Sequence, residues 1–353
     1  MIEIYPDTKV YIVAPAASAT GGPELLHQLA YHMINDLNIS AYMYYIPSTH
    51  SNPIHPAYED YKVPFVREIE DEENNLLIVP EVHMGISLLE HFPNIRKAIW
   101  WLSVDNFYLS IVFRSKLNFF PQRMINKIWR KLFKFELFDT TSLALKSKKF
   151  ESFELSNFVK KADYHFVQSF YALNFIKNKG INPEKIYYLS DYLNKNFLNI
   201  QTDLSKKENI VAYNPKKGLY FTKKIIKSAK DIKFVPLINM SREEVIKTLQ
   251  RAKVYIDFGN HPGKDRIPRE AAILGCCVIT GKRGSAAFFE DVPIPDEYKF
   301  EDKEENIPKI IEKIKDCFEN FEERYKDFDY YRQVIKNEPQ KFIEDLKKIF
   351  VRV

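Results

Sequence analysis

Short apolar runs alternate with stretches of helical periodicity along the first half of the chain. The apolar run 10–14 is followed by small residues and then by apolar positions at helical spacing from Leu25 to Leu37. A helix is predicted over 169–180, where Gly180 suits a helix C-terminus. Similar apolar runs predict strands at 41–46, 76–79, 98–104, 164–167 and 186–189. Repeated strand-then-helix units predict a parallel sheet covered by helices.

The alternation stops in the polar segment 194–208 and then starts again. Strands are predicted at 210–212, 234–237, 254–258 and 277–280, and helices at 217–230 and 269–274. Ser241 and Glu244 have the spacing of a capping box, which predicts another helix start. The charged C-terminal segment keeps helical spacing, and we expect a final helix over 339–350 to cross back to the first domain.

This pattern predicts an α/β protein with two Rossmann-like domains. A chain of 353 residues is long enough to bury two separate cores. The first domain is predicted to span 1–193, with 330–353 crossing back to it. A linker over 194–208 leads to the second domain, 209–329.

The composition is that of a globular protein, because 45% of the residues are apolar and 28% are charged. The cysteines Cys276, Cys277 and Cys317 form no disulfide framework and are interpreted as reduced core thiols. The first residues lack the layout of a signal peptide, and no run approaches the ~20 apolar residues that span a bilayer. We therefore expect a cytoplasmic protein that touches a membrane, if at all, from that side.

The net charge of +5 is unevenly distributed, because residues 114–150 carry many cations and only Glu136 and Asp139 as anions. From Met124 to Phe135 apolar positions fall at helical spacing with cations between them, as in an interfacial helix on anionic lipid. The alternative is a helix that packs on its own domain while its lysines reach water. No recognised nucleic-acid motif accompanies this stretch, so we expect no nucleic-acid partner. The cations are Arg114, Lys116, Arg123, Lys127, Arg130, Lys131, Lys134, Lys146, Lys148 and Lys149.

Two segments follow predicted strands, at the sheet edge where ligands bind in such folds. In the first, Gly21 and Gly22 precede a predicted helix, so that backbone N–H groups can approach an anion. The alternative is a flexible turn with Pro23 at the first helical position. Both interpretations stay open.

The second segment, 257–281, is dense in Gly, His, Lys, Asp and Arg and leads into a helix that carries Glu270 in its predicted first turn. A carboxylate there can accept hydrogen bonds from vicinal hydroxyls, as acidic residues do for ribose in dinucleotide folds. The alternative is a glutamate that only favours the helix dipole.

This second segment resembles the donor-binding region of group-1 retaining glycosyltransferases with the GT-B fold, whose pattern is E-G-F-G-L-P-x-x-E-A-x-A-x-G-x-P-V-I. Gly263 matches the first glycine, Glu270 the second glutamate, and Gly275 the later glycine. The resemblance implies two facing Rossmann-like domains and a Glu270 that binds the ribose of a nucleotide-sugar. The first glutamate, usually placed against the donor sugar, falls on Pro262. One of the flanking residues His261, Lys264 and Asp265 would contact the sugar instead, and His261 is our candidate for this role.

Other positions match the same family. Gly21 and Gly22 resemble its first-loop glycine pair, and Lys217 takes the position of its diphosphate-binding lysine. An ammonium there would stabilise charge that grows as the glycosidic bond breaks. Gly284 and Ser285 lie where the family places a backbone-rich loop near the phosphates.

Asp105 stands where the family often carries a histidine, so it contacts the donor or the acceptor, or only begins a turn. The sequence has no zinc spacing and no P-loop. We therefore expect no metal and no cofactor, with Lys217, Lys264 and Arg266 neutralising the diphosphate.

Together these features predict a metal-independent glycosyltransferase of surface polysaccharide biosynthesis. It would move a sugar from a nucleotide-diphosphate-sugar donor to a glycan or lipid-linked glycan acceptor. An inactive partner subunit of a polysaccharide-assembly complex is the alternative that Pro262 keeps open, and a nucleotide-sugar epimerase is another.

Overall fold

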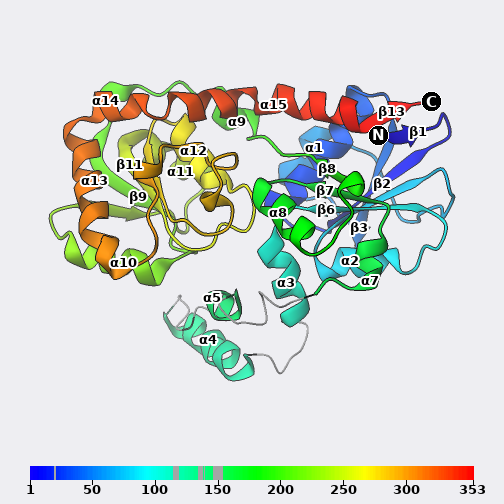
Figure 1. Ribbon diagram of the computed structural model, residues 1–353, viewed down its shortest axis with the longest axis horizontal. Coiled ribbons are helices and arrows are strands. Elements are labelled where there is room, and N and C mark those ends of the chain that lie inside the picture. The colour runs from blue at the N-terminus through cyan, green and yellow to red at the C-terminus, as the bar shows by residue number, and fades with distance from the viewer. Residues whose placement is uncertain (20, 114–118, 134–137, 139, 146–153) are drawn as a thin grey trace. The chain divides into compact units, whose positions relative to one another are not determined.

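The computed structural model describes the chain except for residues 20, 114–118, 134–137, 139 and 146–153, and its contacts divide it into two units (Figure 1). Unit 1 comprises Met1–Gln168, Ala172–Leu189 and Ile343–Val353, and unit 2 comprises Ser169–Tyr171 and Ser190–Phe342. The last helix, α15 (Asp329–Ile349), contributes its first part to unit 2 and its last part to unit 1. The chain thus returns to its first domain, as predicted.

Unit 1 is built on a seven-stranded parallel sheet with the strand order β4-β3-β2-β5-β6-β7-β8. Its central strand β5 is buried at all five positions, which explains why it appears in the sequence as an unbroken apolar run. The strands are β2 (Lys9–Pro15), β3 (Ser40–Ile46), β4 (Phe65–Val66), β5 (Leu76–Pro80), β6 (Arg96–Trp101), β7 (Tyr164–Val167) and β8 (Ile186–Tyr188).

Helices connect these strands, as parallel pairing requires. The buried positions of α1 include Leu25, Leu26 and Leu29, the apolar stripe predicted from the sequence. The helical segments are α1 (Gly21–Asn35), η1 (Pro56–Tyr61), α2 (His83–Leu89), α3 (Val104–Val112), α4 (Phe120–Phe133), α5 (Thr140–Leu145), α7 (Asn157–Lys161), α8 (Phe170–Asn178) and η2 (Pro183–Lys185).

The two ends of the chain pair with each other. β1 (Ile2–Ile4) and β13 (Phe350–Arg352) form a parallel two-stranded sheet within unit 1. Ile2, Ile4 and Phe350 are buried there. The pairing was not predicted, because three-residue strands carry almost no periodic signal.

Unit 2 is built on a four-stranded parallel sheet with the order β10-β9-β11-β12. Helices α11 and α13 pack against β11, and α12 packs against β12. The strands are β9 (Glu208–Tyr213), β10 (Lys233–Pro236), β11 (Ala252–Asp257) and β12 (Cys277–Thr280). The helical segments are α9 (Lys195–Leu198), η3 (Leu204–Lys206), α10 (Leu219–Ser228), α11 (Arg242–Arg251), α12 (Arg266–Ile273), η4 (Ser285–Ala287), η5 (Asp296–Tyr298), η6 (Glu304–Asn306), α13 (Ile307–Glu319) and α14 (Phe321–Lys326).

Each unit contains a parallel sheet whose strands are connected by helices, which confirms the predicted fold class. The capping box is also confirmed, since Ser241 and Glu244 exchange side-chain and backbone hydrogen bonds at the start of α11. Cys276, Cys277 and Cys317 are free and buried.

Several predicted boundaries were wrong. The strand predicted over 98–104 ends at Trp101, because Ser103 accepts a hydrogen bond from the Asn106 N–H and so caps α3. The final helix begins at Asp329, well before the predicted 339, and contains Pro339 in its interior. Buried Tyr331 and Ile335 extend its apolar side before the proline, so packing outweighs the lost backbone bond.

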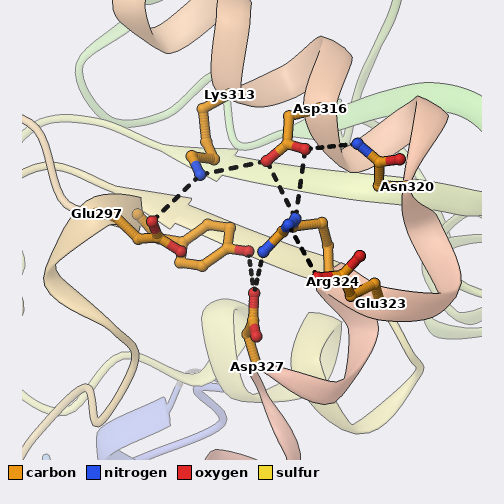
Figure 2. A network of polar contacts seen from close by, with 8 residues as sticks. Glu297, Lys313, Asp316, Asn320, Glu323, Arg324 and Asp327 are labelled. Carbon is orange, nitrogen blue, oxygen red and sulfur yellow. Dashed lines mark hydrogen bonds and ion pairs between the residues drawn. The ribbon is translucent and has the colours of Figure 1, made fainter.

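A polar network ties η5, α13 and α14 together at one corner of unit 2 (Figure 2). Arg324 lies 3.1 Å from Asp316 and 3.4 Å from Asp327, and the buried Tyr298 donates to Asp327 at 2.5 Å. Lys313 bridges Asp316 and Glu297. Because these charges share partners, the network orients α14 after the break that follows α13.

Candidate functional site

The loops that follow β9, β11 and β12 meet at the carboxyl edge of the unit 2 sheet. Parallel neighbouring strands place these loops, 214–218, 258–265 and 281–285, on the same side. Ligands of open parallel sheets bind at that edge. Most of the predicted site residues lie in these loops or at the start of α12.

The first two loops touch backbone to backbone. Gly218 has φ +54°, and a Cβ on it would lie 2.0 Å from the Phe258 carbonyl oxygen. Gly259 has φ +111°, and a Cβ on it would lie 2.6 Å from the Gly218 nitrogen. No side chain fits between the loops, so glycine is required on both sides of the contact.

The third loop joins in the same way. Gly284 has φ +62°, and a Cβ there would lie 2.0 Å from the His261 carbonyl oxygen. That oxygen accepts a hydrogen bond from the Ser285 N–H at 2.9 Å, and the Ser285 hydroxyl donates to the Gly263 carbonyl at 2.5 Å. The structure therefore brings the predicted residues Gly263, Gly284 and Ser285 together.

Charged side chains of the first two loops and of the end of β11 form a cluster. The Lys217 ammonium donates to Asp265 at 2.5 Å, and His261 Nδ1 lies 2.9 Å from the same carboxylate oxygen. His261 Nε2 faces the Asp257 backbone carbonyl at 3.3 Å, and the Tyr255 hydroxyl donates to the Asp257 carboxylate at 2.7 Å. Asp265 is thus the anion shared by two cationic groups.

The pKa values follow from this arrangement. Burial alone would raise the pKa of Asp265, but the charge of Lys217 and the bond from His261 lower it to about 2. Burial opposes the charged imidazole, yet the bond to Asp265 and the charges of both aspartates raise the pKa of His261. Burial raises the pKa of Asp257.

The oxygen and nitrogen ligand atoms of Asp257, His261 and Asp265 lie within 4.8 Å of one another, the spacing of a metal-binding group. The Lys217 ammonium, however, already takes the cation position on Asp265, and the raised pKa of His261 favours a second positive charge. A divalent ion would have to displace both charges. The cluster therefore fits a balanced set of ion pairs better than a metal site.

His261 was predicted to contact the donor sugar. Its side chain has no exposed surface and is directed at Asp265. In this structure it positions the carboxylate that holds Lys217, and the lysine is the group of this cluster that reaches the surface, with 27% of its side chain exposed.

Lys264 was predicted to neutralise a diphosphate, but the structure buries it. Its ammonium lies 2.7 Å from Glu338 and 3.2 Å from the Ser190 hydroxyl, with only 6% of the side chain exposed. Arg269 is fully buried beside it and pairs with both Asp191 and Glu338. These two cations and two anions compensate one another in the interior, so Lys264 serves the fold of unit 2.

Glu270 lies in the second turn of α12, because the helix begins at Arg266, earlier than predicted. The first turn contains no acidic residue. Since the dipole effect is strongest within the first turn, helix stabilisation alone explains Glu270 poorly. Glu270 and Arg266 are both half-buried.

In unit 1, Gly21 and Gly22 form the first two residues of α1, so Pro23 is the third helical residue and not the first. Asp105 lies in the first turn of α3 and is 2% exposed. It belongs to the helix, in contrast to the strand end or turn predicted from the sequence.

Sequence reasoning missed two features at the sheet edges. Arg283, directly before Gly284, lies 2.8 Å from Asp302. In unit 1 the buried Glu81 accepts the Leu102 N–H at 3.0 Å just after β5, and burial raises its pKa to about 8. The only sequence signal for Arg283 was its place next to a loop glycine, and for Glu81 its place directly after an apolar strand.

No family model matches this chain, and no curated protein matches it at the level of sequence. Solved structures do match. HepE of Anabaena in complex with UDP-glucose is 10% identical, with a TM-score of 0.59 over 96% of this chain and 99% of HepE. The lipopolysaccharide outer core galactosyltransferase WaaB is 9% identical, with a TM-score of 0.55 over 96% of this chain and 99% of WaaB.

TarM of S. aureus, in complex with fondaparinux, alpha-GlcNAc-glycerol and UDP, is 14% identical, with a TM-score of 0.51 over 80% of this chain. This chain spans 56% of the length of TarM. These neighbours are GT-B glycosyltransferases. The chain has the GT-B fold.

The loop contact leads to a first prediction. Gly218→Ala adds a methyl group against the Phe258 carbonyl and forces a left-handed alanine, so we expect a loss of roughly 3 kcal/mol in the free energy of unfolding. Gly180→Ala is the control, because Gly180 has φ +80° with no atom near its added Cβ and should lose only about 1–2 kcal/mol. Denaturant unfolding measures both. Equal losses would contradict the tight contact.

Glu81 leads to a second prediction, on pH. The unfolded chain releases this proton near pH 4.5, whereas the folded chain keeps it to about pH 8. The unfolded state therefore binds fewer protons over this window, and the free energy of unfolding should fall by a few kcal/mol as pH rises through it. Glu81→Gln should remove that fall. Denaturant unfolding of both proteins at several pH values tests this, and identical pH profiles would contradict it.

Proposed function

We propose that this chain is a glycosyltransferase that uses a nucleoside diphosphate sugar as donor and a glycan or lipid-linked glycan as acceptor. The observation that carries the proposal is the site at the unit 2 sheet edge. There, three glycine loops meet and a partly exposed Lys217 is held by a buried carboxylate. HepE with its bound UDP-glucose, TarM with UDP and the galactosyltransferase WaaB, which share this fold, support the choice of donor class and reaction.

Each residue has a role in the proposed reaction. The bond between the sugar and the terminal phosphate breaks, and its electron pair stays on the phosphate oxygen. The acceptor hydroxyl oxygen forms the new bond to the sugar, and its proton passes to the leaving diphosphate. Lys217 stabilises the negative charge that grows on the leaving diphosphate, and Asp265 holds its ammonium in place. Glu270 accepts hydrogen bonds from the ribose hydroxyls. His261 acts through Asp265 as a positioning residue.

The loop that contains Gly284 and Ser285, and Arg266 at the start of α12, complete the proposed phosphate site. The glycine pair Gly21 and Gly22 at the start of α1 is proposed to bind an anion through its backbone N–H groups. No metal takes part in this proposal. Asp105 is also proposed to contact the donor or the acceptor, although its side chain is buried in this structure.

An inactive partner subunit is the second candidate function. Pro262 replaces the glutamate that the glycosyltransferase pattern places against the donor sugar, and the neighbouring His261 is turned inward. Such a protein would bind no nucleotide donor.

A nucleotide panel tests these proposals. Thermal unfolding is measured with UDP-, GDP-, ADP- and dTDP-sugars, and we expect stabilisation by sugars of one base because binding to the folded state raises the midpoint. Glu270→Ala should weaken that binding about tenfold or more, because a charged hydrogen bond contributes about 1.5–3 kcal/mol. Glu243→Ala, an exposed glutamate of α11, is the matched control.

Each outcome separates the candidates. Binding of no donor would support the inactive subunit, and conversion of donor without acceptor would support the epimerase. Unchanged affinity in Glu270→Ala would overturn the role of this residue.

We also propose that α4 attaches the protein to an anionic membrane surface. Phe120, Met124 and Ile128 lie on one side of α4 and are 48–53% exposed. Arg123 and Lys127 beside them are exposed as well. A helix with an exposed apolar stripe and cations along its borders suits the lipid interface.

Part of the predicted basic stretch lies outside the described residues, namely Arg114, Lys116, Lys134, Lys146, Lys148 and Lys149. The proposal therefore depends on α4 alone. No described helix combines the length and the apolar composition that crossing a membrane requires.

Vesicle flotation tests the attachment. With phosphatidylglycerol vesicles we expect the double variant Met124→Ser/Ile128→Ser to bind at least about tenfold more weakly than the wild type, because two apolar side chains no longer enter the lipid. Phe289→Ser removes an equally exposed apolar side chain of unit 2 and should bind like the wild type. Wild-type binding that is absent, or equal on phosphatidylcholine, would contradict an anionic lipid site.

A further inference from the structure

Arg283 lies at the same sheet edge as Lys217 and is connected to it by a short series of contacts. Its guanidinium lies 2.8 Å from Asp302. The Gly259 backbone N–H is close enough to the Asp302 carboxylate to oppose the rise of its pKa on burial. Gly259 is the residue whose backbone touches Gly218, the neighbour of Lys217. Each cation is therefore linked to one residue of this backbone contact: Lys217 directly precedes Gly218, and Arg283 pairs with Asp302, which lies near Gly259.

The ion pair of Arg283 with Asp302 resembles that of Lys217 with Asp265. In each, a mostly buried carboxylate holds a cation that remains partly exposed: Asp302 is 12% exposed beside Arg283 at 30%, and Asp265 is 16% exposed beside Lys217 at 27%. Lys264 and Arg269, at 6% and 0%, are enclosed instead. Exposure thus separates the cations that can meet a ligand from those that serve the interior.

Asp302 is held firmly in place. A Cβ on Gly281 would lie 2.8 Å from its Oδ1, so the loop after β12 passes directly over the carboxylate. Burial raises its pKa, and the charge of Arg283 opposes that shift. A cation anchored in this way loses little side-chain entropy when an anion arrives.

We infer that Arg283 is a further phosphate-binding residue, in addition to Lys217 and Arg266, and that Asp302 positions it. The inference rests on the proposed function, because it assigns the ligand of the same site. A diphosphate carries more charge than the Lys217 ammonium alone can compensate. The planar guanidinium offers two parallel N–H donors that match two phosphate oxygens, which an ammonium does not. Lys217 and Arg283 together then hold the leaving diphosphate from two loops.

Isothermal titration on the full chain tests the inference. The probes are UDP, GDP, ADP, dTDP, the corresponding nucleosides and inorganic pyrophosphate. We expect Arg283→Gln to weaken binding of pyrophosphate and of the accepted nucleoside diphosphate roughly tenfold to hundredfold, since bonds to charged groups contribute about 1.5–3 kcal/mol. Binding of the nucleoside should not change. Arg283→Lys should recover part of the loss, because it restores the charge without the planar fork.

Lys282→Gln is the matched control. Lys282 directly precedes Arg283 in the same loop, is 34% exposed and pairs with the exposed Asp296. Its loss changes the net charge equally and should leave diphosphate affinity within about twofold, because exposed pairs contribute little.

Asp302→Asn tests the positioning role. It should weaken diphosphate binding with nucleoside affinity unchanged, a selective loss that a general structural defect would not produce. If Arg283→Gln fails to fold, Arg283→Lys decides, since wild-type affinity for pyrophosphate in that variant would overturn the bidentate contact.

Two negative results remain distinct. If the wild type binds none of the nucleotides and no pyrophosphate, the proposed function fails and the inference fails with it. If the wild type binds a nucleoside diphosphate and Arg283→Gln binds it equally well, only the inference about Arg283 fails.

Discussion

The site of unit 2 depends on three glycines, because a β-carbon at any of these positions would clash with a neighbouring loop. At Gly218, Gly259 and Gly284 the loops after neighbouring strands approach to distances that no other residue allows. This contact sets the position of His261 and Ser285, whose backbone groups bond across it. It also determines which side chains of these loops face inward and which remain at the surface. The close approach of the loop backbones therefore determines where the side chains at this edge of the sheet can lie.

The ion pairs of unit 2 lie at two levels of burial. The inner layer of Lys264, Arg269, Asp191 and Glu338 is buried, and each charge there has an opposite partner. Removing one member would leave an unpaired buried charge, which is far more costly than the loss of a surface pair. The outer layer consists of cations held from below by carboxylates, as with Lys217 on Asp265. Only this layer can exchange partners with an anion from solution.

Unit 1 has a different character. The carboxyl edge of its sheet carries buried carboxyl groups at Glu81 and Asp105, and Glu81 accepts the Leu102 N–H. Several of its exposed apolar side chains lie together on α4, at Phe120, Met124, Ile125 and Ile128. The exposed apolar side chains of α4 and the partly exposed cations of unit 2 are the features on which the proposed acceptor and donor classes depend.

The sequence by itself determined the two α/β repeats, the capping box at Ser241 and the segment 257–287 as the candidate site, because periodicity and turn residues act over a few neighbouring positions. It did not determine helix ends such as Arg266 and Asp329, where packing overrides local propensity. Lysines 217 and 264 looked alike in the sequence, and only the tertiary structure separated them. The reason is that exposure and ion pairing depend on residues far away in the chain: Glu338 encloses Lys264, whereas Asp265 leaves Lys217 at the surface.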